Sequence, residues 1–169
     1  MSFRQCFIFI MILILPGPLL AAQFSIPNHN ITLTYPDDWQ SNTSHEKGSL
    51  VLGGVNLNKQ TGLQFRMYHT KMTIENFIDW YVKDYIKQME GHWQGSDMEF
   101  TQITKPNLGK TYYTTSFTYK QRDGTVYIIH HYFWPLAGKI FVILGGVPET
   151  EQLQHELKFD YVAQSVRFH

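Results

Sequence analysis

The side chains in this chain best suited to chemistry are three histidines within or beside strand-like runs: His69, His130 and His131. Imidazole binds metal ions and exchanges protons near neutral pH. His130 and His131 are consecutive in a run typical of a strand, so they project to opposite faces and cannot both bind one ion unless a bulge intervenes. A histidine-lined site would need His69 from another strand. The alternative is that one of the pair lies in the core and the other under a helix edge.

The turn before this strand decides which histidine shares a face with Phe117 and Tyr119. Asp123-Gly124 favours a hairpin turn because Gly adopts a positive φ without steric cost. A two-residue turn places both aromatic residues on the face of His130, whereas a three-residue bulged turn places them on the face of His131. The sequence leaves both arrangements open.

No motif of a common enzyme class occurs in the chain: it lacks the Gly-x-Ser-x-Gly elbow, His-Glu-x-x-His, the P-loop and Gly-x-Gly-x-x-Gly. Ser96 and Asp97 are adjacent in a polar loop, where turn chemistry explains both better than a triad does. We therefore predict a non-enzymatic protein with no catalytic residue, no metal ligand and no cofactor. The alternative is a small hydrolase or metal-dependent enzyme whose site is built from scattered His, Asp and Tyr.

Aromatic side chains are concentrated between residues 112 and 134. Such rings can form a stacking platform for a sugar or peptide, but cross-strand packing under two helices explains most of them without a ligand. Exported accessory domains also contact other proteins through Tyr and Trp. Trp134 therefore joins the three histidines as a candidate ligand or partner contact. The aromatic set is Tyr112, Tyr113, Tyr119, Tyr127, Tyr132, Phe133 and Trp134.

The charge balance argues against a nucleic-acid-binding protein. Lys plus Arg and Asp plus Glu each number 14, so no net field attracts the chain to a polyanion. A length of 169 residues and a hydrophobic fraction of 43% suit one domain with an ample core. The partner that we expect is another protein, of unknown identity.

The N-terminal residues 1–22 are typical of a secretory signal peptide: a basic start, an apolar run over 6–15, a helix-breaking Pro-Gly-Pro and small residues at Ala21-Ala22. We predict cleavage after Ala22, which leaves 23–169 as a single domain exported to a bacterial periplasm or secreted. The apolar run is shorter than the roughly 20 residues that cross a bilayer. We therefore expect no permanent membrane anchor.

Hydrophobic periodicity predicts strands on both sides of a central helix. That helix spans 73–90, with Thr73 as its N-cap, Gly91 as its C-cap and Trp80 within a wide apolar stripe. A meander of three strands over 110–145 should form the centre of the sheet, covered by a helix on each side. The terminal helix begins at Pro148. Its predicted buried stripe is Leu153, Leu157, Tyr161 and Val162.

The order of these elements resembles the PsbP-like superfamily, which includes a photosystem accessory protein, the periplasmic DcrB and a Ran-binding import factor. The resemblance covers residues 24–168, and its one compact motif is Tyr-Pro-x-x-Trp at Tyr35, Pro36 and Trp39. It implies an α+β fold in which a twisted antiparallel sheet carries a helix on each face, as an α/β/α sandwich. It also implies a non-catalytic binding or accessory role, most like that of exported bacterial DcrB-like proteins.

Overall fold

The computed structural model describes residues 21–42, 51–58, 60–92, 98–104, 112–120 and 124–169. Most of the predicted signal peptide, the Ser96-Asp97 pair and the first part of the Arg122-Asp-Gly turn lie outside these residues. The elements, in chain order, are β1 (Ala21–Ile26), the 3-10 turn η1 (Pro27–His29), β2 (Ile31–Pro36), β3 (Gln40–Asn42), β4 (Val51–Asn56), β5 (Gly62–His69), α1 (Ile74–His92), β6 (Met98–Thr104), β7 (Tyr113–Lys120), β8 (Val126–Leu136), β9 (Lys139–Pro148), the 3-10 turn η2 (Glu149–Glu151), α2 (Gln152–Ser165) and β10 (Arg167–Phe168).

The strands form two antiparallel sheets. The larger has seven strands in the order β3-β4-β5-β9-β8-β7-β6, and the smaller has three in the order β1-β2-β10. β8 and β9 lie in the middle of the larger sheet, as the apolar character of both their faces predicts. They are joined by a tight turn in which Gly138 adopts a φ of +67°.

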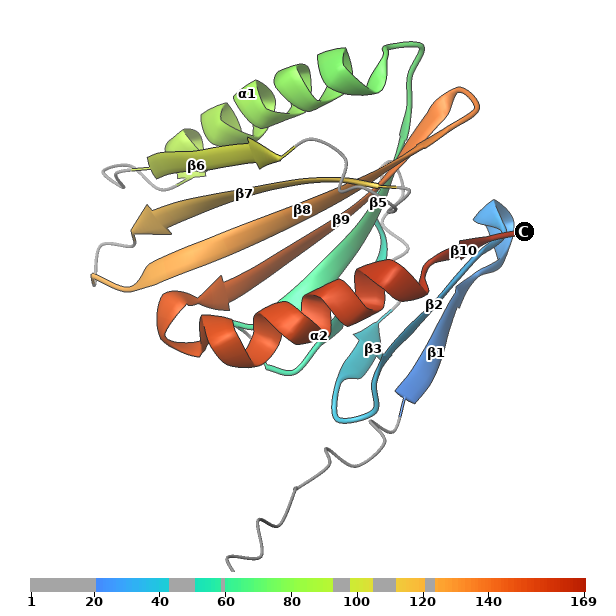
Figure 1. The fold of residues 1–169 in the computed structure, drawn as a ribbon, viewed down its shortest axis with the longest axis horizontal. Coiled ribbons are helices and arrows are strands. Elements are labelled where there is room, and N and C mark those ends of the chain that lie inside the picture. Colours follow the sequence, from blue (N-terminus) through green and yellow to red (C-terminus); the bar gives the residue numbers. More distant parts are fainter. Residues whose placement is uncertain (1–20, 43–50, 59, 93–97, 105–111, 121–123) are drawn as a thin grey trace, which may run out of the picture.

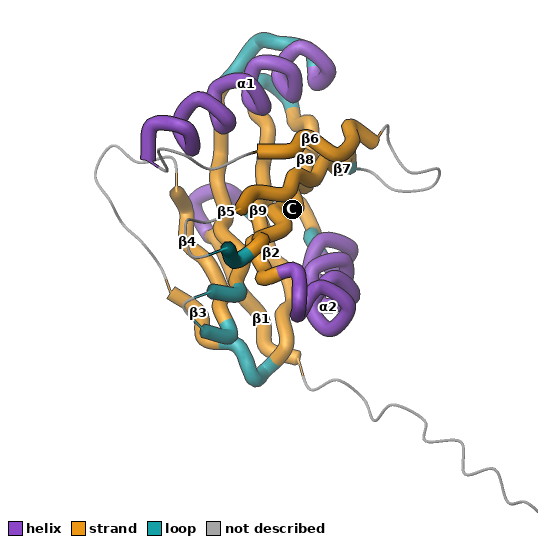
Figure 2. Tube along the Cα trace, turned by 90° about the vertical axis from the view of Figure 1, so that its left-hand side faces the viewer, coloured by secondary structure: helices purple, strands orange, loops and turns teal. Residues whose placement is uncertain are grey.

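Each face of the larger sheet is covered by a helix, as Figures 1 and 2 show. α1 packs on one face over β7, β8 and β9, and α2 packs on the other together with the small sheet. The predicted α+β fold with a helix on each face is therefore confirmed. Within the described residues, neither helix is long and apolar enough to cross a membrane.

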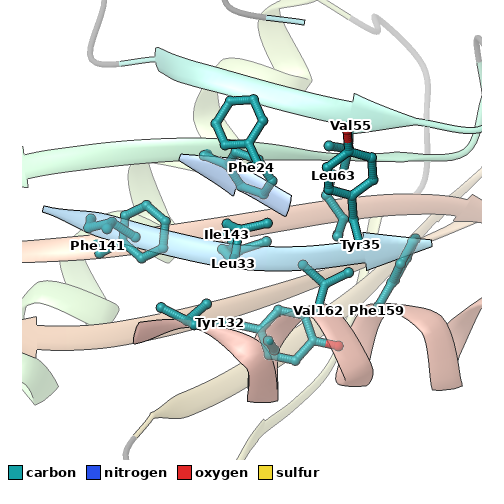
Figure 3. Close-up of a cluster of buried hydrophobic side chains, with 14 of the residues drawn as sticks. Phe24, Leu33, Tyr35, Val55, Leu63, Tyr132, Phe141, Ile143, Phe159 and Val162 are labelled. Atoms are coloured by element: carbon teal, nitrogen blue, oxygen red, sulfur yellow. The ribbon is translucent and has the colours of Figure 1, made fainter. Parts of the chain in front are cut away.

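The core on the α2 side joins the small sheet, the large sheet and α2 (Figure 3). Strict alternation in β2 buries Ile31, Leu33 and Tyr35, to 1%, 2% and 7% exposure. The turn that follows is closed by a hydrogen bond from the Trp39 amide to the Pro36 carbonyl, 3.1 Å long. The Trp39 ring then packs edge-on to Phe159 of α2, with centroids 5.8 Å apart. The Tyr-Pro-x-x-Trp motif thus attaches the small sheet to the core.

α1 buries most of the face that its periodicity predicts. Phe77, Ile78 and Tyr81 are buried against β8 and β9, and the Thr73 hydroxyl accepts a 3.4 Å hydrogen bond from the Asn76 amide. Two details of the prediction are wrong. Trp80 is 43% exposed, at the edge of the buried stripe, and the helix runs through Gly91 to His92 instead of ending before Gly91.

The buried face predicted for α2 is wrong except at Val162. The helix buries His155, Phe159, Val162 and Ala163, and turns the leucines at 153 and 157 to solvent. Gly145 of β9 contributes to this orientation: a Cβ there would clash with Leu63 and lie 3.0 Å from the Phe159 ring, so the missing side chain leaves room for both side chains on this face of the sheet. Pro148 ends β9, and the 3-10 turn η2 precedes the helix.

Candidate functional site on the outer face of α2

The structure separates the three histidines. His69, at the end of β5, pairs with Lys139 of β9, whereas His130 of β8 pairs with Gly145. Six residues of extended chain separate these two positions on β9, about 20 Å. His130 faces α2 and His131 faces α1. The structure therefore does not bring His69 together with His130 or His131 in one histidine-lined site.

His131 lies in an aromatic enclosure beneath α1. Its side chain is 0% exposed, and its ring centroid lies 4.8 Å from Phe117, 4.9 Å from Tyr85 and 5.3 Å from Tyr81. Burial, reinforced by the positive charge of Arg66, holds the pKa of His131 well below its ordinary value. The register pairs Thr115 with His131, and so puts Phe117 on its face, as a bulged turn predicts. His131 is a neutral core residue.

A group of polar residues lines a cavity of about 200 Å³ between β7, β8 and α2. Ser116 and His130 stand directly opposite each other in the β7–β8 register. Tyr132, two residues along β8, donates a hydrogen bond of 3.2 Å to Asp160 of α2. The cavity lining is Thr114, Thr115, Ser116, His130, His131, Tyr132, Glu156 and Asp160.

The charges around this cavity are set by α2. Burial lowers the pKa of His130, while Glu156 and Asp160 act in the opposite direction. Burial and Asp160 raise the pKa of Tyr132 well above its ordinary value, so its hydroxyl stays protonated and able to donate. No group of three His, Cys, Asp or Glu suited to a metal ion occurs in the described part of the chain. The cavity is thus an acidic, hydrogen-bonding recess.

The outer face of α2, next to this cavity, carries an apolar stripe formed by Leu153, Leu157 and Tyr161. These side chains are 87%, 76% and 37% exposed. They recur at intervals of four residues, so they follow one line along the helix. Glu156 and Asp160 flank the stripe on the side of the cavity, since each precedes a stripe residue by about 100° of helix rotation. We call this combination of stripe and acidic flank the α2 surface.

Trp134 is not part of this surface. It is 2% exposed and packs against Tyr112 and Phe141, with centroids 5.1 and 5.5 Å away. Its role in the described structure is core packing, as is that of Tyr35. Sequence reasoning missed the α2 surface because it assigned the leucines to the core. The signal that would have found it is the second apolar set on the same helix, Phe159, Val162 and Ala163.

Searches against protein-family models and curated protein sequences find no match. Solved structures are similar in fold. The solution structure of cyanobacterial PsbP (CyanoP) from Synechocystis sp. PCC 6803 aligns with a TM-score of 0.71 and 16% sequence identity, over 91% of this chain and 95% of CyanoP. The crystal structure of the Ran-binding protein Mog1p from Saccharomyces cerevisiae aligns with a TM-score of 0.60 and 13% identity, over 88% and 95% of the two chains. The chain therefore has the PsbP-like fold.

Proposed function

We propose that this protein is an exported, non-enzymatic binding domain that holds another protein against the α2 surface. The observation that carries the proposal is the exposure of Leu153 and Leu157, 87% and 76%, on a helix whose opposite side is anchored in the core. Aligned apolar side chains beside charged groups are typical of an interface, where an apolar centre is surrounded by a polar rim.

The charge of the α2 surface indicates the chemistry of the partner. Glu156 and Asp160 border the stripe on the side of the cavity, and the Tyr132 hydroxyl is already committed to Asp160. A partner that offers apolar side chains together with Lys or Arg would bury the leucines and pair with the acids. The Ran-binding description of Mog1p supports a protein-binding role for this fold.

A photo-crosslinking amino acid at position 157, in the protein expressed in its native host, tests the proposal. We expect one discrete adduct, which Leu153→Asp removes because it places a charge in the apolar centre. The matched control is the same crosslinker at Lys87, an exposed position on α1. Equal adducts from positions 157 and 87, or an adduct that Leu153→Asp leaves unchanged, would reject the α2 surface as the binding site.

Among the described residues, a hydroxyl, an imidazole and a carboxylate come together in the cavity, where Ser116 stands opposite His130 and near Asp160. The Nε2 atom of His130 has no hydrogen-bond partner, and Asp160 accepts from Tyr132 instead of orienting an imidazole. We therefore expect no turnover of activated ester substrates. Turnover that Ser116→Ala abolishes would establish the enzymatic alternative.

Export is tested by the N-terminus of the mature protein. Cleavage after Ala22 would leave Gln23 as the first residue of β1, and the pairs from Gln23–Thr34 to Ile26–Ile31 would remain. We expect cell fractionation and N-terminal sequencing to find Gln23 first, in the periplasm or medium. An intact Met1 in the cytoplasm would contradict export.

A further inference from the structure

A second recess lies on the opposite face of the sheet from α2, beside the area that α1 covers. It is a depression of about 440 Å³ over β4, β5 and β9. Figure 2 shows α1 across the upper end of the sheet and β3 and β4 farther down. The volume falls within the range of small-molecule sites, about 300–1,000 Å³. The recess is separate from the α2 surface.

Glycines at neighbouring register positions make the depression. Gln64 of β5 is flanked by Gly54 of β4 and Leu144 of β9. In the adjacent row Gly62 is flanked by Asn56 and Gly146. Three of these six positions have no side chain above the sheet, so a bound molecule can approach the backbone closely.

Two amide side chains in the lining of the recess keep their N–H groups as donors because their oxygens are already used. The Asn58 Oδ1 atom accepts from the backbone amides of Gln60 and Thr61, at 2.8 and 2.7 Å. The Gln64 Oε1 atom accepts from Nε and Nη2 of Arg66, at 2.9 and 2.6 Å. Backbone amides and guanidinium groups only donate, so the amide orientation is fixed by these bonds. Both NH₂ groups are left as donors.

Arg66 adds a positive charge next to this recess: it is not a lining residue, but its guanidinium donates to Gln64, which is one. Its side chain is half-buried beside α1, and its hydrogen bonds go to neutral oxygens of Gln64 and of Tyr68, the latter 3.4 Å away. The described residues form no ion pair with it. No carboxylate side chain lines the depression itself, but Glu151 accepts a 3.3 Å hydrogen bond from the hydroxyl of Thr61, a lining residue. A guanidinium that has no acid as its own partner favours an anionic ligand.

We propose that this depression binds a small hydroxycarboxylate, the chemical class that includes sugar acids. The carboxylate would accept from the Gln64 amide and lie within the field of Arg66. The hydroxyl groups would pair with Asn42 and with Asn56, which line the same recess; the Asn56 Nδ2 atom also donates to the Asn58 carbonyl, 3.4 Å away. This inference does not depend on the α2 surface, and either site can fail alone.

Titration monitored by ¹⁵N NMR of the side-chain amides tests the inference. The probes are D-glucuronate and L-tartrate, with D-glucose as the neutral counterpart of the first. We expect saturable shifts of the Asn58 and Gln64 amide signals with the acids, and binding of glucose at least about tenfold weaker. The absence of a saturable shift with both acids, or equal affinity for glucuronate and glucose, would overturn the proposal.

The variant Gln64→Glu replaces the NH₂ donor by an oxygen and gives Arg66 a carboxylate partner, so the fold should be retained while glucuronate affinity falls at least about tenfold. Gln164→Glu adds the same charge on an exposed turn of α2, and we expect it to bind glucuronate as the unmodified protein does. Unchanged affinity in Gln64→Glu, or an equal loss in both variants, would contradict a site at Gln64.

Discussion

α1 and α2 lie on opposite faces of one sheet and both carry apolar residues at helical spacing, yet only α1 buries most of the predicted set. The face that α1 meets is lined by large rings, including Phe117, Tyr127 and Phe133, and its own aromatic side chains cover them. α2 meets Gly145, where Phe159 fills the space of a missing side chain. The difference shows that apolar periodicity identifies the faces that a helix could bury. The sizes of the side chains on the sheet decide which of these faces is buried.

The apolar side chains of α1 and α2 also differ in what they do. On α1 the apolar side chains stabilise the fold, with Phe77 and Tyr81 exposed by only 1% and 3%. On α2 the second apolar set is left outside, next to the acids of the cavity. A stability measurement can therefore separate a core helix face from a binding face.

The largest expected effect comes from truncating a buried ring of α1. Phe77→Ala removes a side chain that contacts Tyr68, Tyr81 and Phe133. We expect the free energy of unfolding to fall by about 3–5 kcal/mol, because the transfer free energy of the ring is lost and the cavity left behind adds a further cost. Urea unfolding followed by circular dichroism measures this change.

Leu157→Ala on α2 is the matched control for this truncation. It removes a side chain that is 76% exposed, so we expect a change within about 0.5 kcal/mol. A loss near that of Phe77→Ala would show that the stripe packs against the protein itself, and the contrast between the helices would be wrong.

The second effect tests why α2 is oriented as it is. Gly145→Ala places a methyl group against Leu63 and 3.0 Å from the Phe159 ring, and we expect about 1–3 kcal/mol of destabilisation from overpacking. The double variant with Phe159→Leu should lose less than the sum of the two single variants, because the smaller side chain relieves the part of the overpacking that comes from the ring. Additive losses in urea unfolding would mean that Gly145 does not set the orientation.

The sequence predicts the fold more fully than it predicts the surface. Alternation in β2 and β5, the Thr73 cap and the Tyr-Pro-x-x-Trp turn are local signals, and the structure confirms them. The burial of Phe159 depends on Gly145, which lies 14 residues earlier in a different element, β9. Helical periodicity shows the apolar sets of α2 but not which of them meets this glycine, so the buried face of α2 could not be read from the pattern alone.

The same limit applies to the candidate sites. The cavity joins Ser116 and His130 to two acids of α2, and the second recess depends on Gly54, Gly62 and Gly146 falling in adjacent rows. Strand register brings these residues together, and register follows from the whole sheet. His130 was identified from its residue type, but its partners were not.

The third effect is a loss of stability at acidic pH, which compares His131 on the α1 side of the sheet with His130 on the α2 side. The folded-state pKa of His131 lies well below its ordinary value of 6.5, so the unfolded chain binds the proton more readily. Stability is therefore fully present above pH 6.5 and is lost as the pH falls below it. The charged and titratable groups that face the ring are Arg66 of β5 and Tyr81 and Tyr85 of α1, and His130 acts on it electrostatically from the other face of the sheet.

Unfolding experiments from pH 7.5 downward should show that His131→Phe has a flatter pH dependence below 6.5 than the unmodified protein. His130→Gln should change the slope less, because Glu156 and Asp160 offset part of the burial effect at His130. If His131→Phe leaves the slope of stability against pH unchanged, or if His130→Gln alters it more, then His131 is not the histidine that causes the loss of stability on acidification.

The smallest effect concerns the ion pair that links α2 to the turn after β2, where Lys158 lies 3.0 Å from Asp38. The two side chains are 26% and 49% exposed, so solvent and salt screen their attraction and holding them together costs side-chain entropy. A double-mutant cycle with Lys158→Met and Asp38→Asn should give a coupling of about 0.5 kcal/mol or less, which decreases in 1 M NaCl. A coupling above about 1 kcal/mol that decreases in 1 M NaCl would mean that electrostatics, as well as the fit of Phe159 on Gly145, helps to orient α2.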